Sequence, residues 1–211
     1  LRENGEMLYS EAEIVELRSN VRIERIFLLD SPLSKKSFAK FNAEEKRYYL
    51  EQHNCHVPIS ESVIYALKQA DIIIYSAGTQ HSSLYPSYIS TGLSETIANN
   101  KKATKIFITN IGADYETPQY QASDYLLGAF KYLNLTDKKN YRMEELFDYI
   151  FINKGRNLDS SSYVKYDEEG FKDIKIKKII KNFESINFPG KHDGDLLTEE
   201  ILKLHRQKHI N

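Results

Sequence analysis

Apolar and polar positions follow each other along the chain in a pattern that predicts short buried strands separated by helices. Uninterrupted apolar runs that end at glycine or small polar residues are typical of strands covered on both faces. Such runs occur in "ADIIIYSAG" (70–78), "KATKIFITNIG" (102–112) and "FDYIFIN" (147–153). The segment 20–30 begins by alternating, ends fully apolar and stops at Ser31 and Pro32, so it is also predicted to be a strand. "IKIKKII" (174–180) alternates, which predicts an edge strand whose lysines face water.

Between these strands, apolar residues recur at helical spacing. The predicted helices lie around 42–52, over 60–69 with Ser60 as N-cap, over 87–99, over 121–133 and over 195–208. The polar, serine-rich stretch 154–170 is predicted to be a loop excursion. Strands and helices that alternate at these lengths predict an α/β fold, with a Rossmann-like, doubly wound and largely parallel sheet carrying helices on both faces. We expect one domain over residues 1–211.

Composition narrows the class of protein. The 211 residues carry a formal net charge of −1 with acids and bases interspersed, which gives no electrostatic case for binding nucleic acid or an anionic membrane. Cys55 is the only cysteine, so an internal disulfide is excluded and a cytoplasmic location is expected. No stretch approaches 18 consecutive apolar residues. The chain begins with Leu1 rather than methionine, which suggests a fragment or a processed chain.

The loop after the strand at 70–78 carries residues suited to holding an anion. Gly78 permits tight turning and close backbone approach, and Thr79, Ser82 and Ser83 supply hydroxyl groups ahead of a helix N-terminus. The same residue types also suit plain turn and capping roles. The residues by themselves therefore leave a phosphate cradle and a connecting turn both open.

The loop after the strand at 102–112 is the second candidate. In open parallel sheets, ligands bind beyond the carboxyl ends of the strands, so Asn110 and Glu116 could hold Mg²⁺ or a ribose hydroxyl there. The alternative is a solvated loop broken at Thr117 and Pro118. Ser123 and Asp124 fall in the first turn of the next helix, where capping already explains their types.

Other motifs are weaker. His53, Cys55 and His56 cluster, but a second ligand pair at zinc-site spacing is missing, and we assign no metal ligand there. G-x-S-x-G, P-loop and G-x-G-x-x-G patterns are absent from the sequence.

Taken in order, these stretches resemble the CofD/YvcK-like family, which comprises 2-phospho-L-lactate transferases and gluconeogenesis factors. "ADIIIYSAGTQHSSLYPSYISTGLSETI" is similar to the family segment "AD-L-I-V-x-G-P-G-S-L-Y-T-S-x-x-P-N-L-L-x-x-G-I-x-E-A-I". "KATKIFITNIGADYETPQYQASDYL" resembles "A-P-K-V-Y-V-x-N-x-M-T-Q-P-G-E-T-x-G-x-x-x-S-D-H-V" with one residue deleted. "RIERIFLLD", "FDYIFINKG" and "KHDGDLLTEEILKL" parallel three further family segments in the same order.

Three departures accompany the resemblance. Ser76 and Ala77 replace the family's Gly-Pro, and a shortened Gly-Ala-Asp-Tyr at 112–115 replaces Met-Thr-Gln-Pro-Gly. The family's opening G-G-G-T-G strand-turn and its acidic D-D-G-G-S-S-G stretch have no counterpart here. The chain is therefore expected to be the C-terminal portion of a larger CofD-like domain.

The resemblance implies a nucleotide-diphosphate or nucleotide-sugar ligand. The transferases attach a phospholactyl-type group to a deazaflavin alcohol with Mg²⁺, whose ligands we expect mostly in the N-terminal part that this chain lacks. The gluconeogenesis-factor branch implies a regulator that binds nucleotide sugars such as UDP-N-acetylglucosamine without chemistry. A degenerate interaction domain is a third reading, a homodimer stays open, and catalytic residues are not assigned. The implied ligand- and phosphate-binding residues are Gly78, Thr79, Ser82, Ser83, Asn110, Glu116, Thr117, Ser123 and Asp124.

Overall fold

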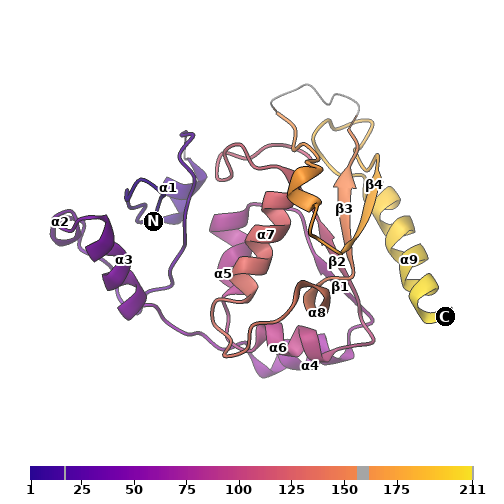
Figure 1. Ribbon diagram of the computed structural model, residues 1–211, viewed down its shortest axis with the longest axis horizontal. Coiled ribbons are helices and arrows are strands. Elements are labelled where there is room, and N and C mark those ends of the chain that lie inside the picture. Colours follow the sequence, from indigo (N-terminus) through magenta and orange to yellow (C-terminus); the bar gives the residue numbers. More distant parts are fainter. Residues whose placement is uncertain (17, 156–161, 211) are drawn as a thin grey trace.

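A four-stranded parallel sheet forms the centre of the computed structural model, which describes residues 1–16, 18–155 and 162–210 (Figure 1). Its strands, in spatial order, are β1 (Ile72–Tyr75), β2 (Thr104–Ile108), β3 (Tyr149–Asn153) and β4 (Lys177–Lys181). The register places Ile74 opposite Ile106 and Phe107 opposite Ile150. Every residue of β2 and β3 is buried, whereas β4 lies at the edge and exposes Lys177. The predicted parallel sheet and the predicted edge strand are therefore confirmed.

Helices cover both faces of this sheet, with α9 on one face and α5 and α7 on the other (Figure 1). The helices are α1 (Glu11–Val15), α2 (Lys35–Phe38), α3 (Ala43–Gln52), α4 (Glu61–Gln69), α5 (Tyr85–Tyr88), α6 (Leu93–Asn99), α7 (Ala122–Leu133), α8 (Met143–Leu146) and α9 (Gly194–Ile210). A π-helical turn, η1 (Gln80–Leu84), precedes α5, and a 3-10 turn, η2 (Glu169–Phe171), precedes β4. The helices predicted around 42–52, 60–69, 121–133 and 195–208 are confirmed as α3, α4, α7 and α9.

The two faces of the sheet pack into separate apolar clusters because successive strand residues point to opposite sides. On one side Phe107 and Ile150 join a cluster with α7, which contributes Leu126. On the other side Ile106 packs in a cluster with Ile201 of α9. A strand covered on both faces favours apolar residues on both sides, and this produces the uninterrupted apolar runs in the sequence.

The helix predicted over 87–99 is wrong in its extent. The chain instead forms η1 and α5, breaks near Gly92, and resumes as α6. Gly92 has a φ of +85°, in the left-handed region that favours glycine, and its N–H donates to Asp137 Oδ1 at 2.7 Å. A continuous helix would require a helical φ at this position and would lose that contact.

The strand predicted over 20–30 is also wrong. The segment makes only isolated bridges, between Ile23 and Arg2 and between Leu29 and Asn54. Its amides are instead bound one at a time: Ile26 N–H donates to the Tyr132 hydroxyl at 3.2 Å, for example. An apolar run becomes a strand only where a neighbouring strand runs beside it in register, and none does so among the described residues.

The N-terminal part, with α1 to α3, lies beside the main body (Figure 1). It has a small cluster of its own around Phe38 and Leu50. Arg22, between α1 and α2, forms a salt bridge with Asp124 at the start of α7, with 3.1 Å between Arg22 Nη1 and Asp124 Oδ1. Of the predicted excursion at 154–170, residues 156–161 lie outside the described residues. Among the described helices, none is long and apolar enough to cross a membrane.

Candidate functional site

A pocket of about 330 Å³ lies beyond the carboxyl ends of β1 and β2, where ligands bind in open parallel sheets. Three loops line it: residues 77–79 after β1, residues 110–114 after β2, and residues 190–192 before α9. Gly78, Thr79 and Asn110, three of the predicted binding residues, therefore lie on its wall.

A reciprocal pair of hydrogen bonds holds the first two loops together. The Gly78 N–H donates to Asn110 Oδ1 at 3.0 Å, and Asn110 Nδ2 donates to the Gly78 carbonyl at 3.0 Å. Gly78 does not have a positive φ, and an added Cβ would meet Leu84 only at an ordinary 3.7 Å. The backbone conformation at this position therefore does not require glycine. Because Gly78 has no side chain, its backbone at the pocket wall is not covered by a Cβ.

The third loop approaches closely enough to form the opposite wall. A Cβ added to Gly112 would lie 3.5 Å from the Gly190 carbonyl oxygen, and Gly190 itself has a φ of +76°. The Gly190 N–H donates to Glu184 Oε1 at 2.7 Å, which holds the turn in place. Two glycines therefore allow this loop to close on the loop after β2.

Lys191 and His192 enter the pocket on this third loop, and the sequence prediction missed them. The exposed Lys191 supplies a positive charge. Burial lowers the pKa of His192, although its hydrogen bond to the Thr109 backbone acts in the opposite direction. His192 is therefore neutral at neutral pH. The signal in the sequence was the "KHDGD" segment, which matched the family's closing pattern but was not assigned to the site.

Glu116 occupies the anion position that the loop after β1 offers. Its carboxylate accepts hydrogen bonds from the His81 N–H at 2.9 Å, from the Ser82 N–H at 3.0 Å and from the Ser82 hydroxyl. Glu116 is fully buried. The amides and the hydroxyl that were predicted to cradle a phosphate therefore hold a carboxylate of the protein itself. Ser83 lies beside them and accepts from the Thr79 hydroxyl at 2.8 Å.

The remaining predicted residues lie at the start of α7 and have partners within the fold. The Thr117 and Tyr125 hydroxyls are 2.8 Å apart. The Ser123 N–H donates to Asp167 Oδ1 at 3.0 Å. Asp124 pairs with Arg22 and caps α7 by accepting from the Gln121 N–H at 2.9 Å. The structure thus does not bring six of the predicted residues to the wall of this pocket, and a ligand contact by them stays a prediction: Ser82, Ser83, Glu116, Thr117, Ser123 and Asp124.

Comparison with known proteins identifies the family. A profile of the family described as 2-phospho-L-lactate transferase CofD matches residues 2–186. The chain belongs to the CofD family. No curated protein matches the chain.

Solved structures agree with this assignment at the level of the fold. Two crystal structures of a UPF0052-family protein from Bacillus halodurans are similar to the CofD-family chain, with TM-scores of 0.67 and 0.68 and identities of 20% and 21%. Each comparison covers 95% of this chain, but only 56% and 57% of the Bacillus protein. The chain thus spans little more than half the length of this relative.

The family resemblance implies Mg²⁺, which prefers carboxylate and other oxygen ligands. Within the described ranges, no three His, Cys, Asp or Glu side chains gather as a metal site. Asp114 is the one carboxylate on the described wall of the pocket, and its Oδ1 accepts from the Glu116 N–H at 3.1 Å. In the cluster of His53, Cys55 and His56, the His53 ring stacks on the Tyr49 ring, with 4.0 Å between the ring centroids.

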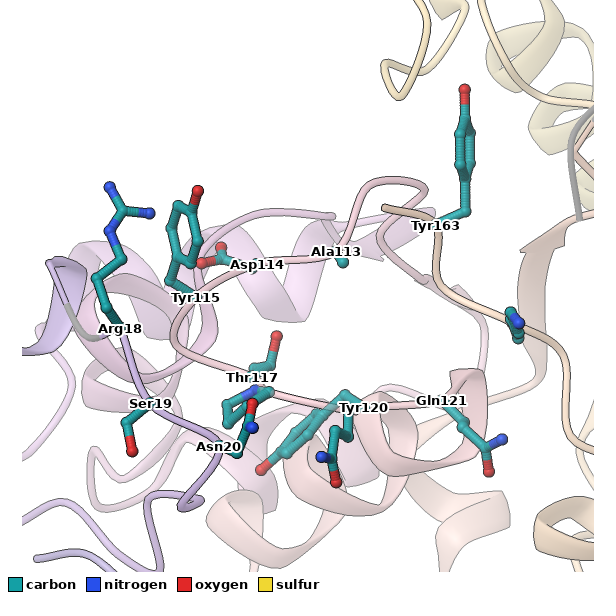
Figure 2. Close-up of a pocket in the computed structure, with 13 residues that line it drawn as sticks. Arg18, Ser19, Asn20, Ala113, Asp114, Tyr115, Thr117, Tyr120, Gln121 and Tyr163 are labelled. Atoms are coloured by element: carbon teal, nitrogen blue, oxygen red, sulfur yellow. The ribbon is translucent and has the colours of Figure 1, made fainter. Parts of the chain in front are cut away.

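A second and larger cavity, of about 650 Å³, lies across the loop after β2 (Figure 2). It shares Ala113 and Asp114 with the pocket at the strand ends. Figure 2 shows Arg18 and Tyr115 on one side of its opening and Tyr163 on the other. None of these three residues was predicted as a site residue from the sequence.

Proposed function

We propose that this CofD-family chain binds the diphosphate group of a nucleotide diphosphate or nucleotide sugar in the pocket at the ends of β1 and β2. Transfer of a phosphorus-containing group is the activity that the family supports. The observation that carries the proposal is the position of the pocket, because adjacent carboxyl ends of parallel strands leave a crevice in which phosphates bind. Gly78, Gly112 and Gly190 leave backbone uncovered around it.

The side chains of the pocket suit a diphosphate. Lys191 offers a mobile ammonium group, which binds phosphate oxygens as a point charge. His192 is neutral at neutral pH, since burial lowers its pKa, and a neutral imidazole can donate one hydrogen bond or accept a proton from a substrate hydroxyl. Asn110 holds the loop after β1 against the loop after β2 through its two hydrogen bonds with Gly78.

Mg²⁺ is part of the proposal, and Asp114 is the residue of the pocket that would hold it. Mg²⁺ commonly takes only one or two carboxylates from a protein and completes its shell with phosphate oxygens and water. A single carboxylate thus suits a cation that arrives with the diphosphate. When bound, Mg²⁺ would offset negative charge on the leaving diphosphate. Without it, Asp114 repels the ligand.

A binding protein without turnover is the second candidate. It is favoured by the internal bonding of Glu116 and Ser123, which leaves few described groups free to act on a substrate. His192 is the described pocket residue whose ring could take a proton. The same pocket would then serve a regulator that senses a nucleotide sugar. In either case a homodimer remains a prediction, which light scattering after size-exclusion chromatography tests.

Calorimetric titration with GDP, UDP and UDP-N-acetylglucosamine, with and without Mg²⁺, tests the binding proposal. We expect Lys191→Ala to weaken binding about tenfold, since a charge-assisted hydrogen bond contributes roughly 1.5–3 kcal/mol. Lys175→Ala, at an exposed lysine just before β4 and outside the pocket lining, is the matched control and should bind as the unchanged protein does. Absence of binding by all three ligands, or equal binding by both variants, would contradict the proposal.

Turnover separates the two candidates. Mg²⁺-dependent consumption of a nucleotide-linked donor would establish group transfer, and loss of this activity in His192→Ala with binding retained would assign proton transfer to the imidazole. Binding with no consumption of the donor would favour the regulator.

A further inference from the structure

The cavity of about 650 Å³ and the pocket at the strand ends share a wall. Ala113 and Asp114 line both, so the two compartments border the same loop and lie next to each other. A cavity of this size falls in the range that holds small organic ligands, whereas the smaller pocket suits a compact group such as a diphosphate.

The lining of the larger cavity differs in kind from that of the pocket. It combines aromatic rings, side-chain amides and two cationic groups. The aromatic residues are Tyr115, Tyr120 and Tyr163, and the amides are Asn20, Gln119 and Gln121. The cationic residues are Arg18 and Lys165. Aromatic faces bind planar rings by stacking, and amides read the hydrogen-bonding edge of such rings. This combination is suited to a planar nitrogen heterocycle.

The ring of Tyr115 is placed where it can stack on a planar ring of a ligand. Tyr115 is 58% exposed, and the guanidinium carbon of Arg18 lies 3.5 Å from the centroid of its ring. A guanidinium at this distance holds the ring in a fixed orientation and covers one of its faces. Tyr115 also lies in the shortened loop at 112–115, where the sequence departs from the pattern of the family that it resembles.

Glu184 connects the two compartments. Its Oε1 accepts from the Tyr163 hydroxyl at 2.7 Å, which fixes a ring on the wall of the larger cavity. The same oxygen accepts from the Gly190 N–H at 2.7 Å, which fixes the loop that brings Lys191 to the smaller pocket. Glu184 is buried, with 5% of its surface exposed. One carboxylate therefore positions a wall of each compartment.

We infer that the larger cavity receives the planar nitrogen heterocycle of the ligand whose diphosphate occupies the smaller pocket. Tyr115 and Tyr163 flank the ring, and Glu184 is a positioning residue that aligns the two compartments. The inference rests on the proposed function, because the diphosphate defines which end of the ligand reaches the cavity.

Calorimetric titrations with UDP, GDP and pyrophosphate test the inference, since pyrophosphate lacks the heterocycle. We expect the nucleotides to bind on the order of tenfold more tightly than pyrophosphate, because stacking one base contributes about 1–3 kcal/mol and about 1.4 kcal/mol corresponds to tenfold. Tyr115→Ala should remove most of this advantage and leave pyrophosphate binding unchanged, whereas Tyr115→Phe should keep it. Tyr65→Ala, at a 70% exposed tyrosine of α4, is the control and should alter neither affinity.

Two variants test the positioning role of Glu184. Glu184→Ala should weaken both nucleotides and pyrophosphate, because both compartments lose their support. Glu184→Gln retains a side-chain oxygen that accepts hydrogen bonds and should restore both affinities. Weakening of nucleotides alone, or failure of the glutamine to rescue, would remove Glu184 from its positioning role.

The outcomes distinguish the inference from the function on which it rests. Binding of pyrophosphate as tight as that of UDP and GDP would overturn the heterocycle compartment and leave the diphosphate pocket standing. Binding of none of the three would overturn both. Nucleotide binding that survives Tyr115→Ala with its tenfold advantage intact would place the heterocycle outside the cavity.

Discussion

Replacement of Glu116 tests whether the loop after β1 is held by the protein's own carboxylate. In the structure this carboxylate accepts hydrogen bonds from the amides of His81 and Ser82 and from the Ser82 hydroxyl, at a fully buried position. Glu116→Ala would leave both amides without an acceptor. Glu116→Gln keeps the shape and one acceptor oxygen but loses the charge.

The expected loss of stability follows from the two amide donors that lose their acceptor. A buried donor without a partner costs about 1–3 kcal/mol, so the loss of two amide bonds should lower the free energy of unfolding by about 3–5 kcal/mol. The serine hydroxyl can rotate toward water and adds little. For Glu116→Gln we expect about 1–2 kcal/mol. In a chain of this size 1 kcal/mol moves the melting temperature by about 2–4 °C, so the alanine variant should melt roughly 10 °C lower.

Urea denaturation followed by circular dichroism, together with thermal melting, measures these changes. Glu199→Ala, at an exposed glutamate of α9, is the matched control and should change stability by less than about 0.5 kcal/mol. An alanine variant as stable as the unchanged protein, but unable to bind any nucleotide, would refute the reasoning. It would return Glu116 to the ligand-contacting role that the sequence predicted.

Two further predictions concern the buried His81 in this loop and Gly128, which packs against Tyr85. Burial lowers the pKa of His81 to about 3, so the unfolded chain, with a pKa near 6.5, takes up the proton first as the pH falls. Stability should therefore fall by about 2 kcal/mol from pH 7 to pH 5 through this group, and urea denaturation should find a smaller fall in His81→Phe; equal falls would contradict the assignment. A Cβ at Gly128 would lie 2.1 Å from the hydroxyl oxygen of the buried Tyr85, so Gly128→Ala should destabilise the fold by about 1–3 kcal/mol in the same assay. Gly194→Ala, where an added Cβ meets nothing within 4 Å, is its control, and a similar loss in both would show that crowding is not the cause.

Strands at the centre of the sheet were predictable because burial on both faces leaves little choice of residue. The runs in 102–112 and 147–153 became β2 and β3, in which every position is buried. The alternation over 174–180 located the edge, since only an edge strand can turn lysines toward water. Capping residues such as Ser60, which accepts from the Val63 N–H at 3.4 Å, marked helix starts for an equally local reason.

Prediction failed where the outcome depended on distant partners. The apolar run at 20–30 has a strand-like composition, but its amides bind Tyr132 and Asn54 singly instead of a neighbouring strand. The spacing over 87–99 suits a helix, yet the bond from Gly92 to Asp137 fixes a break within it. None of these three partners is visible in a local pattern, because each lies more than twenty residues away in the sequence.

The sequence by itself determined the order of the strands and helices and the strand ends at which a site would form. The reason is that hydrophobic periodicity and capping act between near neighbours. Tertiary structure alone decided which residues reach the site. It placed Gly78 and Asn110 on the pocket wall, turned the Glu116 carboxylate into the internal partner of the amides predicted to hold a phosphate, and brought Lys191 and His192 from a loop about 80 residues beyond Asn110. Those contacts arise from chain packing over long separations, which no local pattern encodes.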